Sequence, residues 1–401
     1  MSFKVALSGI NSASADLDVI SNNLANLSTT GYKVSRAEFS SLVGASQAAT
    51  SGVVQGRGSE LSTVSRSFSQ GNVETTGNSL DLAIEGNGFL IMSDGGAVSY
   101  SRNGSLIVDK DGFVTNAAGH RVQAFSADAN GAITSNIGDL TISTADSAPL
   151  ASSNLTLGTN LDAGETAIAT AFNIADVTTY NSTASATIFD SLGVEHVMST
   201  FFTKTADNAW NMHVALDGVT ASTNNPITFS NSGALTAPVG GTFTIPVTPG
   251  GGAAAQSVDI NLSTTTQFGS EFSINTLQTD GFTTGRLVDI SVADDGVVLA
   301  RYSNGQSEAQ GQVALANFSN LQGLAEGALG SWIETQDSGS PLVGAAGTAS
   351  LGLLQSGALE SSNVDVTEML VNLITAQRNF QANAKTIETT DSLTQSIINI
   401  R

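Results

Sequence analysis

The chain has 401 residues, a formal net charge of −21, 40% hydrophobic residues and no cysteine. This length allows two or three domains with cores of their own. Because so acidic a chain cannot neutralise phosphates, nucleic acids and anionic membrane surfaces are excluded as partners. The absence of cysteine excludes disulfides and thiol chemistry.

The negative charge is concentrated in the interior of the sequence. Residues 1–40 carry three basic and three acidic side chains, and residues 360–401 carry three basic and five acidic ones. Two nearly balanced ends around an acidic middle indicate ends that pack together and a middle that faces water.

Residues 3–27 show the clearest helical pattern. Apolar residues recur at alternating steps of three and four, which is the a/d spacing of a heptad repeat. Because one helix cannot bury such a narrow seam alone, we expect a partner helix in the same chain or in another one. Three asparagines close to Leu24 also fit a helix end before Leu27. The seam consists of Phe3, Ala6, Ile10, Ala13, Leu17, Ile20, Leu24 and Leu27.

A second long helix is predicted over residues 364–401. Leu373, Phe380 and Ile387 recur at intervals of seven, and Asn363 or Asp365 can cap its start. We expect residues 1–27 and 364–401 to form a coiled-coil assembly domain. An amphipathic helix docked on a β-domain of its own chain would show similar spacing. The narrow seam and the glycine-rich segment after it favour packing between chains.

The sequence between the helices is typical of β structure. Residues 28–79, with many glycines, and residues 357–363 are predicted as extended connectors. Alternating apolar residues and Asn-Gly or Asp-Gly turns predict a β-domain split into residues 80–145 and 285–356. Residues 146–284 are predicted as an inserted outer β-domain. The expected fold is mixed: long terminal α-helices and two nested, mainly β domains in a discontinuous, elongated arrangement.

Recognisable motifs occupy residues 6–33, 80–89 and 100–104, and at the other end residues 356–360 and 370–383. These segments resemble the bacterial flagellar hook proteins, which are related to the flagellar rod proteins. Both ends alone fit hook and distal rod proteins alike. The length, the insertion and residues 190–196 followed by Trp210 favour the hook. The family-motif residues are Asn22, Asn23, Asn26, Thr30, Gly31, Gln377, Arg378 and Asn383.

The resemblance implies a subunit that self-assembles into a flexible curved tube. Such a tube encloses a secretion channel and transmits torque from rod to filament as a universal joint. The implied partners are many copies of the chain, the flagellar rod, hook-cap and hook–filament junction proteins, and the flagellar type III export apparatus. The implied location is extracellular, in the hook beside the basal body. Residues 1–10 do not resemble a signal peptide, so export without a cleaved leader is expected. No run of apolar residues is long enough to span a membrane, so membrane insertion is not expected.

Fourteen apolar residues of the two helices are expected to pack between subunits, and Leu17, Leu24, Leu373 and Phe380 are expected to carry most of that packing. The full set is Phe3, Leu7, Ile10, Leu17, Ile20, Leu24, Leu27, Val366, Leu370, Leu373, Ile374, Phe380, Ile387 and Ile398.

Nothing in the sequence predicts catalytic, cofactor-binding or metal-binding residues. His120, His196 and His213 lack metal-ligand spacing, and no nucleophile elbow, P-loop or dinucleotide-binding motif occurs. We therefore predict a structural protein and not an enzyme. The alternatives are a distal rod subunit and, from another class, a secreted β-rich adhesin or enzyme.

Overall fold

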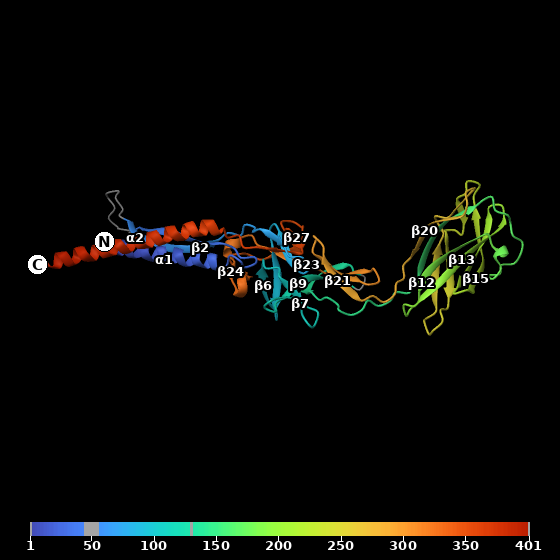
Figure 1. Cartoon of the computed structure of the whole chain (residues 1–401), viewed down its shortest axis with the longest axis horizontal. Helices are drawn as coiled ribbons and strands as arrows, with labels where there is room; N and C mark the ends of the chain where they lie inside the picture. Colours follow the sequence, from blue (N-terminus) through green and yellow to red (C-terminus); the bar gives the residue numbers. More distant parts are fainter. Residues whose placement is uncertain (1, 44–55, 129–130, 400–401) are drawn as a thin grey trace. The chain divides into compact units, whose positions relative to one another are not determined.

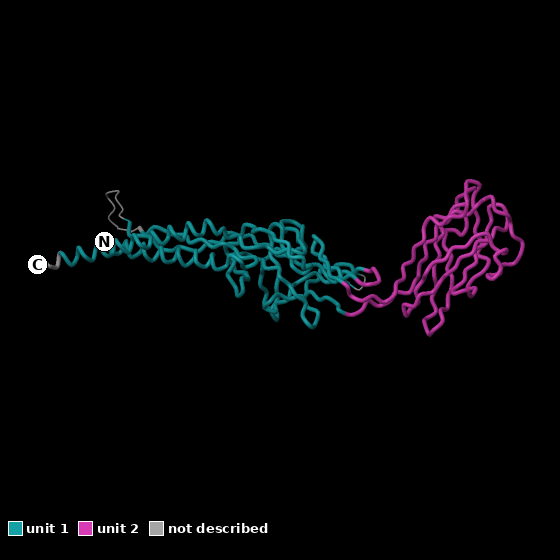
Figure 2. The backbone as a smooth tube through the Cα atoms, in the orientation of Figure 1, with its two compact units in different colours: residues 1–144, 289–301, 307–401 teal, residues 145–288, 302–306 magenta. Residues whose placement is uncertain are grey.

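The computed structural model describes residues 2–43, 56–128 and 131–399, which divide into two compact units (Figure 2). Unit 1 contains the described residues of 1–144, 289–301 and 307–401, and unit 2 contains residues 145–288 and 302–306. Unit 1 holds two long helices and many strands, whereas unit 2 is almost entirely β structure. The fold is therefore mixed, as the sequence predicts.

The two helices of unit 1 lie side by side and run in opposite directions (Figure 1). Helix α1 spans Ser2–Ala25 and helix α2 spans Val366–Asn399. Helix α1 thus ends before Leu27, at the earlier of the two expected ends. Asp365 caps α2, because its Oδ1 accepts a hydrogen bond of 3.0 Å from the N–H of Glu368.

The segment predicted as a connector contains a β-hairpin, so that part of the prediction is wrong. Strand β1 (Ser35–Val43) pairs antiparallel with β2 (Gly56–Arg66), and both contact α1. The period of two is hidden in the sequence by small polar residues and by irregularities between Glu38 and Phe39 and between Ser41 and Val43. Strand β3 (Val73–Thr75) pairs with β28 (Ala358–Glu360), which joins the two connector segments directly.

Most strands of unit 1 belong to one twelve-stranded sheet, whose main path runs β21-β22-β23-β9-β5-β6-β25-β24. Strand β23 pairs with both β9 and β5 and so joins the early and late parts of the chain. Aromatic side chains of Phe89, Tyr100 and Phe318 meet edge to face in the core beside it. The strands are β5 (Phe89–Asp94), β6 (Ala97–Ser101), β7 (Leu106–Val108), β8 (Val114–Asn116), β9 (Arg121–Ala127), β10 (Ile133–Asp139), β21 (Leu287–Val292), β22 (Val297–Tyr302), β23 (Ser307–Asn317), β24 (Ala325–Glu326), β25 (Trp332–Ile333) and β26 (Leu342–Ala345).

Four short elements complete the order of unit 1. Strand β4 (Leu82–Glu85) pairs with β27 (Leu353–Ser356), and two 3₁₀ turns, η2 (Leu321–Gly323) and η3 (Ala328–Gly330), lie between β23 and β25.

Unit 2 is built from two five-stranded sheets that share one core. Trp210, Met212 and Val214 are fully buried, and they alternate along β14 as the sequence predicts. Leu157 and Ile260 from the other sheet belong to the same hydrophobic cluster. The strands are β11 (Asn154–Asp162), β12 (Ser182–Phe189), β13 (Glu195–Ala206), β14 (Ala209–Leu216), β15 (Val219–Phe229), β16 (Leu235–Ala237), β17 (Thr242–Val247), β18 (Gln256–Asn261), β19 (Thr266–Phe268) and β20 (Ser273–Thr279), with the 3₁₀ turn η1 at Val177–Thr179.

The imidazole of His196 links two turns of unit 2. Its Nδ1 lies 2.6 Å from Oδ2 of Asp217, and its Nε2 lies 3.3 Å from Oδ2 of Asp190. The hydrogen bond with Asp217 raises the pKa of His196, and the same contact lowers the pKa of Asp217.

Candidate functional site

The inner faces of α1 and α2 pack against each other within one chain. Ile20, Met369 and Ala376 are buried in a cluster that also takes in Leu17 and Leu373. A Cβ added to Gly9 would lie 2.7 Å from Oδ1 of Asn383, so a larger residue at this position would displace the Asn383 side chain. The partner that the α1 seam requires is therefore present in the same chain.

Asn23 fixes the chain just after α1 to the helix. Its side chain, only 1% exposed, donates from Nδ2 to the carbonyl of Ser35 at 2.7 Å and accepts the N–H of Ser35 at 2.9 Å. The hydroxyl of Tyr32 donates a third hydrogen bond to Oδ1, at 3.1 Å. One amide side chain thus satisfies both backbone groups of the first residue of β1.

Gly31 permits a tight turn between α1 and β1. Its φ is +71°, and a Cβ there would lie 2.6 Å from the carbonyl carbon of Arg102. Its N–H donates to the carbonyl of Glu360 at 2.8 Å. Upstream, the Asn26 side chain donates to Oδ1 of Asn22 at 2.8 Å. These residues shape the turn that leads from the helix into the β structure.

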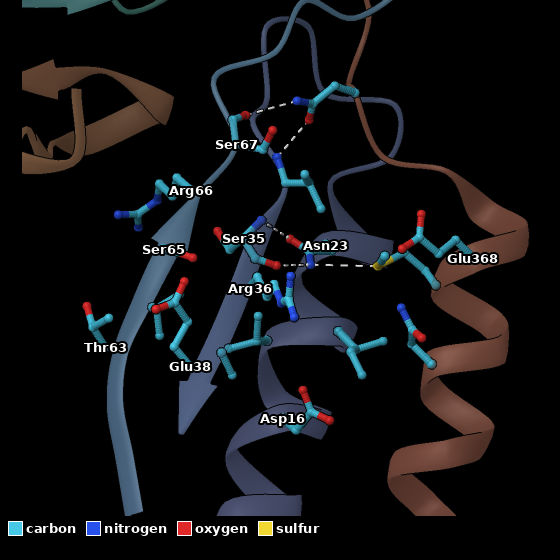
Figure 3. A pocket seen from close by; sticks show the side chains of 18 of the residues that line it. Asp16, Asn23, Ser35, Arg36, Glu38, Thr63, Ser65, Arg66, Ser67 and Glu368 are labelled. Atoms are coloured by element: carbon cyan, nitrogen blue, oxygen red, sulfur yellow. Dashed lines mark hydrogen bonds between the residues drawn. The ribbon is translucent and has the colours of Figure 1, made fainter. Parts of the chain in front are cut away.

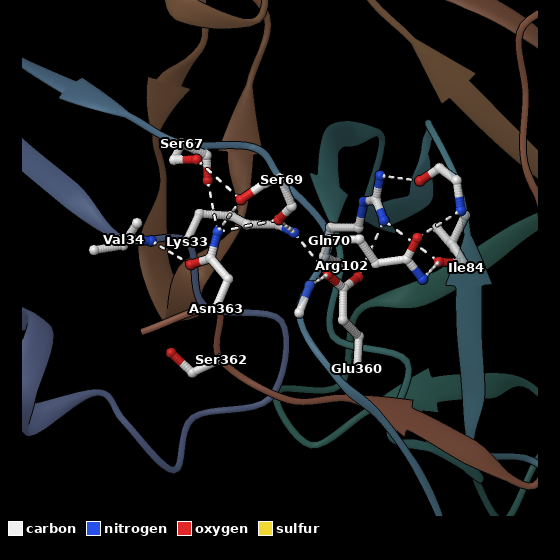
Figure 4. Close-up of polar contacts among 12 residues, drawn as sticks. Lys33, Val34, Ser67, Ser69, Gln70, Ile84, Arg102, Glu360, Ser362 and Asn363 are labelled. Atoms are coloured by element: carbon white, nitrogen blue, oxygen red, sulfur yellow. Dashed lines mark hydrogen bonds and ion pairs between the residues drawn. The ribbon is translucent and has the colours of Figure 1, made fainter. Parts of the chain in front are cut away.

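A buried cluster of three charges joins distant parts of unit 1 (Figure 4). Glu360, whose side chain is 0% exposed, accepts from Nζ of Lys33 at 2.7 Å and from Nη1 of Arg102 at 3.0 Å. Lys33 also donates to the carbonyl of Ser69, at 2.7 Å, and the N–H of Gly71 donates to Glu360. Burial lowers the pKa of Lys33 and of Arg102, and the contacts with Glu360 oppose both shifts.

Asn363, just before α2, reinforces this junction from the other side (Figure 4). Its Oδ1 accepts the N–H of Val34 at 2.7 Å, and its Nδ2 donates to the carbonyls of Ser67 and Ser69 at 3.0 Å. Four side chains thus connect the C-terminal end of α1 and the N-terminal end of α2 to the β structure: Asn23, Lys33, Glu360 and Asn363.

The residues predicted to pack between subunits fall into two groups. Ile20 is buried, and six others are partly buried, whereas six are exposed by 36–51%. On α2 the exposed residues Val366, Leu370 and Ile374 follow one another at steps of four, so they form a stripe on one side of the helix. The side chain of Ile398 lies outside the described residues. The partly buried residues are Ile10, Leu17, Leu24, Leu27, Leu373 and Ile387, and the exposed ones are Phe3, Leu7, Val366, Leu370, Ile374 and Phe380.

The family-motif residues also separate by position. Asn23 and Gly31 are buried, and Asn383 faces Gly9 in the helix contact. Gln377 and Arg378 are exposed on α2, and Thr30 lines a second, smaller cavity beside the turn. The buried members therefore shape the chain itself, while Gln377 and Arg378 lie on its surface.

A groove of about 1,050 Å³ lies between α2 and the β1–β2 hairpin, over α1 (Figure 3). Val19 and Ile20 of α1, Phe39 of β1 and Met369 of α2 contribute apolar surface to it. Its charged lining residues are Asp16, Arg36, Glu38, Arg66, Asp365 and Glu368.

Family models match four consecutive parts of the chain. They are described as Flagella basal body rod protein (residues 3–33), Flagellar hook protein FlgE/F/G D1 domain (83–160), Flagellar basal body protein FlaE D2 domain (160–282) and Flagellar basal body rod FlgEFG protein C-terminal (355–400). The flagellar hook protein FlgE of Salmonella typhimurium is 35% identical over 414 residues, which cover 100% of both chains. This chain belongs to the flagellar hook protein family.

Other hook proteins support the same assignment. The hook protein FlgE of Borreliella burgdorferi is 32% identical over 434 residues, covering 98% of each chain. The crystal structure of the Helicobacter pylori flagellar hook protein FlgE2 superposes with a TM-score of 0.55, covering 72% of this chain and 100% of that one. At 11% identity that likeness supports the fold alone.

Membership of the hook protein family makes this chain a structural protein of the flagellum, outside the cell, and not an enzyme, as the sequence predicts. Within the described ranges, no three His, Asp or Glu side chains gather in a way that could hold a metal ion. Neither described helix is long and apolar enough to cross a membrane.

The charge cluster of this hook protein was not predicted from its sequence. Lys33, Arg102 and Glu360 all lie in segments that resemble the hook family, but no spacing connects residues so far apart. The one available signal was that charged residues are rare, at 12% of the chain.

Proposed function

We propose that this chain is the subunit of the flagellar hook, in which many copies form a flexible curved tube. The tube acts as a universal joint that transmits torque from rod to filament, and the helices surround a secretion channel. The observation that carries the proposal is the full-length similarity to hook proteins, with 100% of both chains aligned. The uncovered apolar stripe on α2 supports assembly through the helices.

The stripe provides a contact that a single chain cannot satisfy. Val366, Leu370 and Ile374 are 39%, 44% and 51% exposed, although their side chains are apolar. The inner face of α2 is already occupied by α1. Because contiguous apolar surface is usually covered in assemblies, the stripe is expected to pack against helices of neighbouring subunits.

The β structure is suited to outer contacts that slide. In a bent rotating tube, each subunit moves past its neighbours at every turn, so outer contacts must be weak and interchangeable. Exposed positions of unit 2 are mostly Ser, Thr, Asn, Gly and Ala, for example along β12, where Thr183, Ser185 and Thr187 are exposed. Small polar side chains form such contacts without fixing one geometry.

The remaining parts of the proposal follow from the family. We expect contacts with the rod at one end of the tube and with hook-cap and hook–filament junction proteins at the other. Export is expected through the flagellar type III apparatus. A distal rod subunit is the alternative within the same family, and the match of whole-length hook proteins disfavours it.

Electron microscopy of basal bodies from cells lacking only this chain tests the proposal. Complete rods without hook or filament are expected, and shortened rods would assign the chain to the distal rod instead. Intact flagella would exclude both. Complementation with Ile374→Asn should fail to restore hooks, whereas Thr389→Asn, an exposed substitution on the same helix, should restore them.

A further inference from the structure

The groove between α2 and the β1–β2 hairpin has features of a binding site. Its volume of about 1,050 Å³ reaches the upper end of the range of ~300–1,000 Å³ that is usual for ligand sites. Val19, Ile20 and Met369 contribute apolar surface to it, and polar side chains such as those of Asp16, Glu38 and Glu368 also line it (Figure 3). It lies wholly within unit 1.

The charge of the groove selects for a cationic occupant. Four carboxylates line it against two guanidinium groups, and one of these, on Arg66, is already paired with Glu326 and lies 5.0 Å from the Trp332 ring centroid. Among the described residues, Asp16, Glu38 and Glu368 form no ion pair. Burial raises the pKa of Asp16, which shows a carboxylate partly withdrawn from water without a compensating cation.

The first turns of α1 have the complementary properties. Phe3, Val5 and Leu7 are 48%, 42% and 43% exposed. Lys4 stands among them, exposed and in no ion pair within the described part of the chain. The first turn carries no acidic residue, so the partial positive charge of the helix start adds to that of Lys4.

We propose that the start of α1 of a second copy of this chain docks into the groove, with Lys4 facing its carboxylates and the apolar side chains covering its apolar surface. This proposal rests on the proposed function and names one contact within the polymer. The interface is head-to-tail: each subunit inserts one helix end and receives another, so copies join into an open polymer. The apolar stripe on α2 then serves a separate contact, since its residues are not among those that line the groove.

A cross-linking test can distinguish docking between two chains from a contact within one chain. Val5 and Asp16 are eleven residues apart on α1, which is ~16 Å along the helix axis. A disulfide requires Cα atoms less than ~7 Å apart. Cysteines at Val5 and at a groove residue can therefore join only between chains, and the chain has no cysteine of its own to interfere.

The test uses polymers of the full chain carrying Val5→Cys with Asn372→Cys, oxidised and run on non-reducing gels. A ladder of dimers and larger multimers is expected. The matched control is Val5→Cys with Val371→Cys, because Val371 is the next residue but lies outside the groove; it should give no ladder. A ladder from the control alone, or none from the groove pair in polymers visible by electron microscopy, would overturn the proposal.

A second groove pair guards against a local folding defect. Thr63 lines the groove from β2, so Val5→Cys with Thr63→Cys should give the same ladder if Asn372→Cys prevents polymer growth. If chains with either groove pair fail to polymerise while chains with the control pair polymerise normally, this result also locates a contact in the groove. The unmodified chain separates the two proposals: if it forms no polymer, the hook function fails, whereas polymers without a ladder refute only the docking of α1.

Discussion

Lys33 and Glu360 are 327 positions apart in the chain, yet Nζ of Lys33 lies 2.7 Å from Oε1 of Glu360 and both side chains are almost fully buried. The second carboxylate oxygen accepts from Arg102 at 3.0 Å. This contact connects the segment that follows α1 to the segment that precedes α2. The two terminal helices are therefore anchored by the same buried charge.

Removing that carboxylate should destabilise unit 1 strongly. Glu360→Gln leaves two buried cations without a counter-charge, a loss of about 3–5 kcal/mol in the free energy of unfolding. Lys33→Met should cost less, because Arg102 and Glu360 remain as a neutral pair. Urea unfolding of the full chain measures both. Glu74→Gln in β3, where the side chain is exposed, is the control and should change stability by less than ~0.5 kcal/mol.

The amide group through which Asn23 donates should contribute to stability as much as the volume of the side chain does. Asn23→Asp keeps the size and one acceptor but cannot donate to the carbonyl of Ser35, so the free energy of unfolding should fall by about 1–3 kcal/mol. Asn22→Asp is the control, because Asn22 is exposed and its Oδ1 only accepts. Equal unfolding midpoints for the two variants would show that the contact with Ser35 contributes little.

Substitution of two glycines can separate the stability cost of backbone strain from that of a steric clash. Gly31 and Gly77 have similar φ values of +71° and +78°, but a Cβ at Gly77 would meet nothing within 4 Å. Gly77→Ala should therefore lower the free energy of unfolding only by the strain of the left-handed conformation, about 1–2 kcal/mol. Gly31→Ala adds the clash with Arg102 and should cost clearly more. Thermal unfolding of the two variants compares them directly, and an equal loss of stability would contradict the close approach of Gly31 to Arg102.

Periodicity in the sequence predicted the helices and the alternation of β14, because burial on one face leaves a repeating pattern. It did not predict the β1–β2 hairpin, where small polar residues replace the apolar ones. The resemblance pointed to Asn23 and Gly31, but their roles depend on Ser35 and Arg102. The charge cluster could not be predicted, since a contact across 327 positions leaves no local signal.

The stripe on α2 shows a further limit of sequence reasoning. The heptad row of Leu373, Phe380 and Ile387 was expected to pack between subunits. In the structure Leu373 packs against the helix pair of its own chain, and the most exposed apolar residues of this turn, Val371 and Ile374, lie off that row. Periodicity locates an apolar face but does not say which chain covers it.

The stability of unit 2 should depend on pH through His196. The pKa of this histidine is raised, so its stabilising effect is complete below about pH 6.5, its ordinary value, and is lost as the pH rises through the raised value. The pKa values of Asp190 and Asp217 are lowered, so their contribution is present above their ordinary value of 3.8 and is lost as the pH falls through the lowered values. Unit 2 should be most stable between these limits.

Fluorescence can follow this unit alone. The chain has two tryptophans, and Trp210 is buried in unit 2 whereas Trp332 belongs to unit 1. In a Trp332→Phe background, the melting temperature reported by Trp210 should be higher at pH 5.5 than at pH 8.5. His196→Asn should abolish or reverse this difference, because the contacts with Asp190 and Asp217 lose their titrating partner, and burial lowers the pKa of His213, which opposes folding at low pH. His120→Asn in unit 1 should preserve the difference. A difference that persists in His196→Asn would assign the pH dependence to other groups.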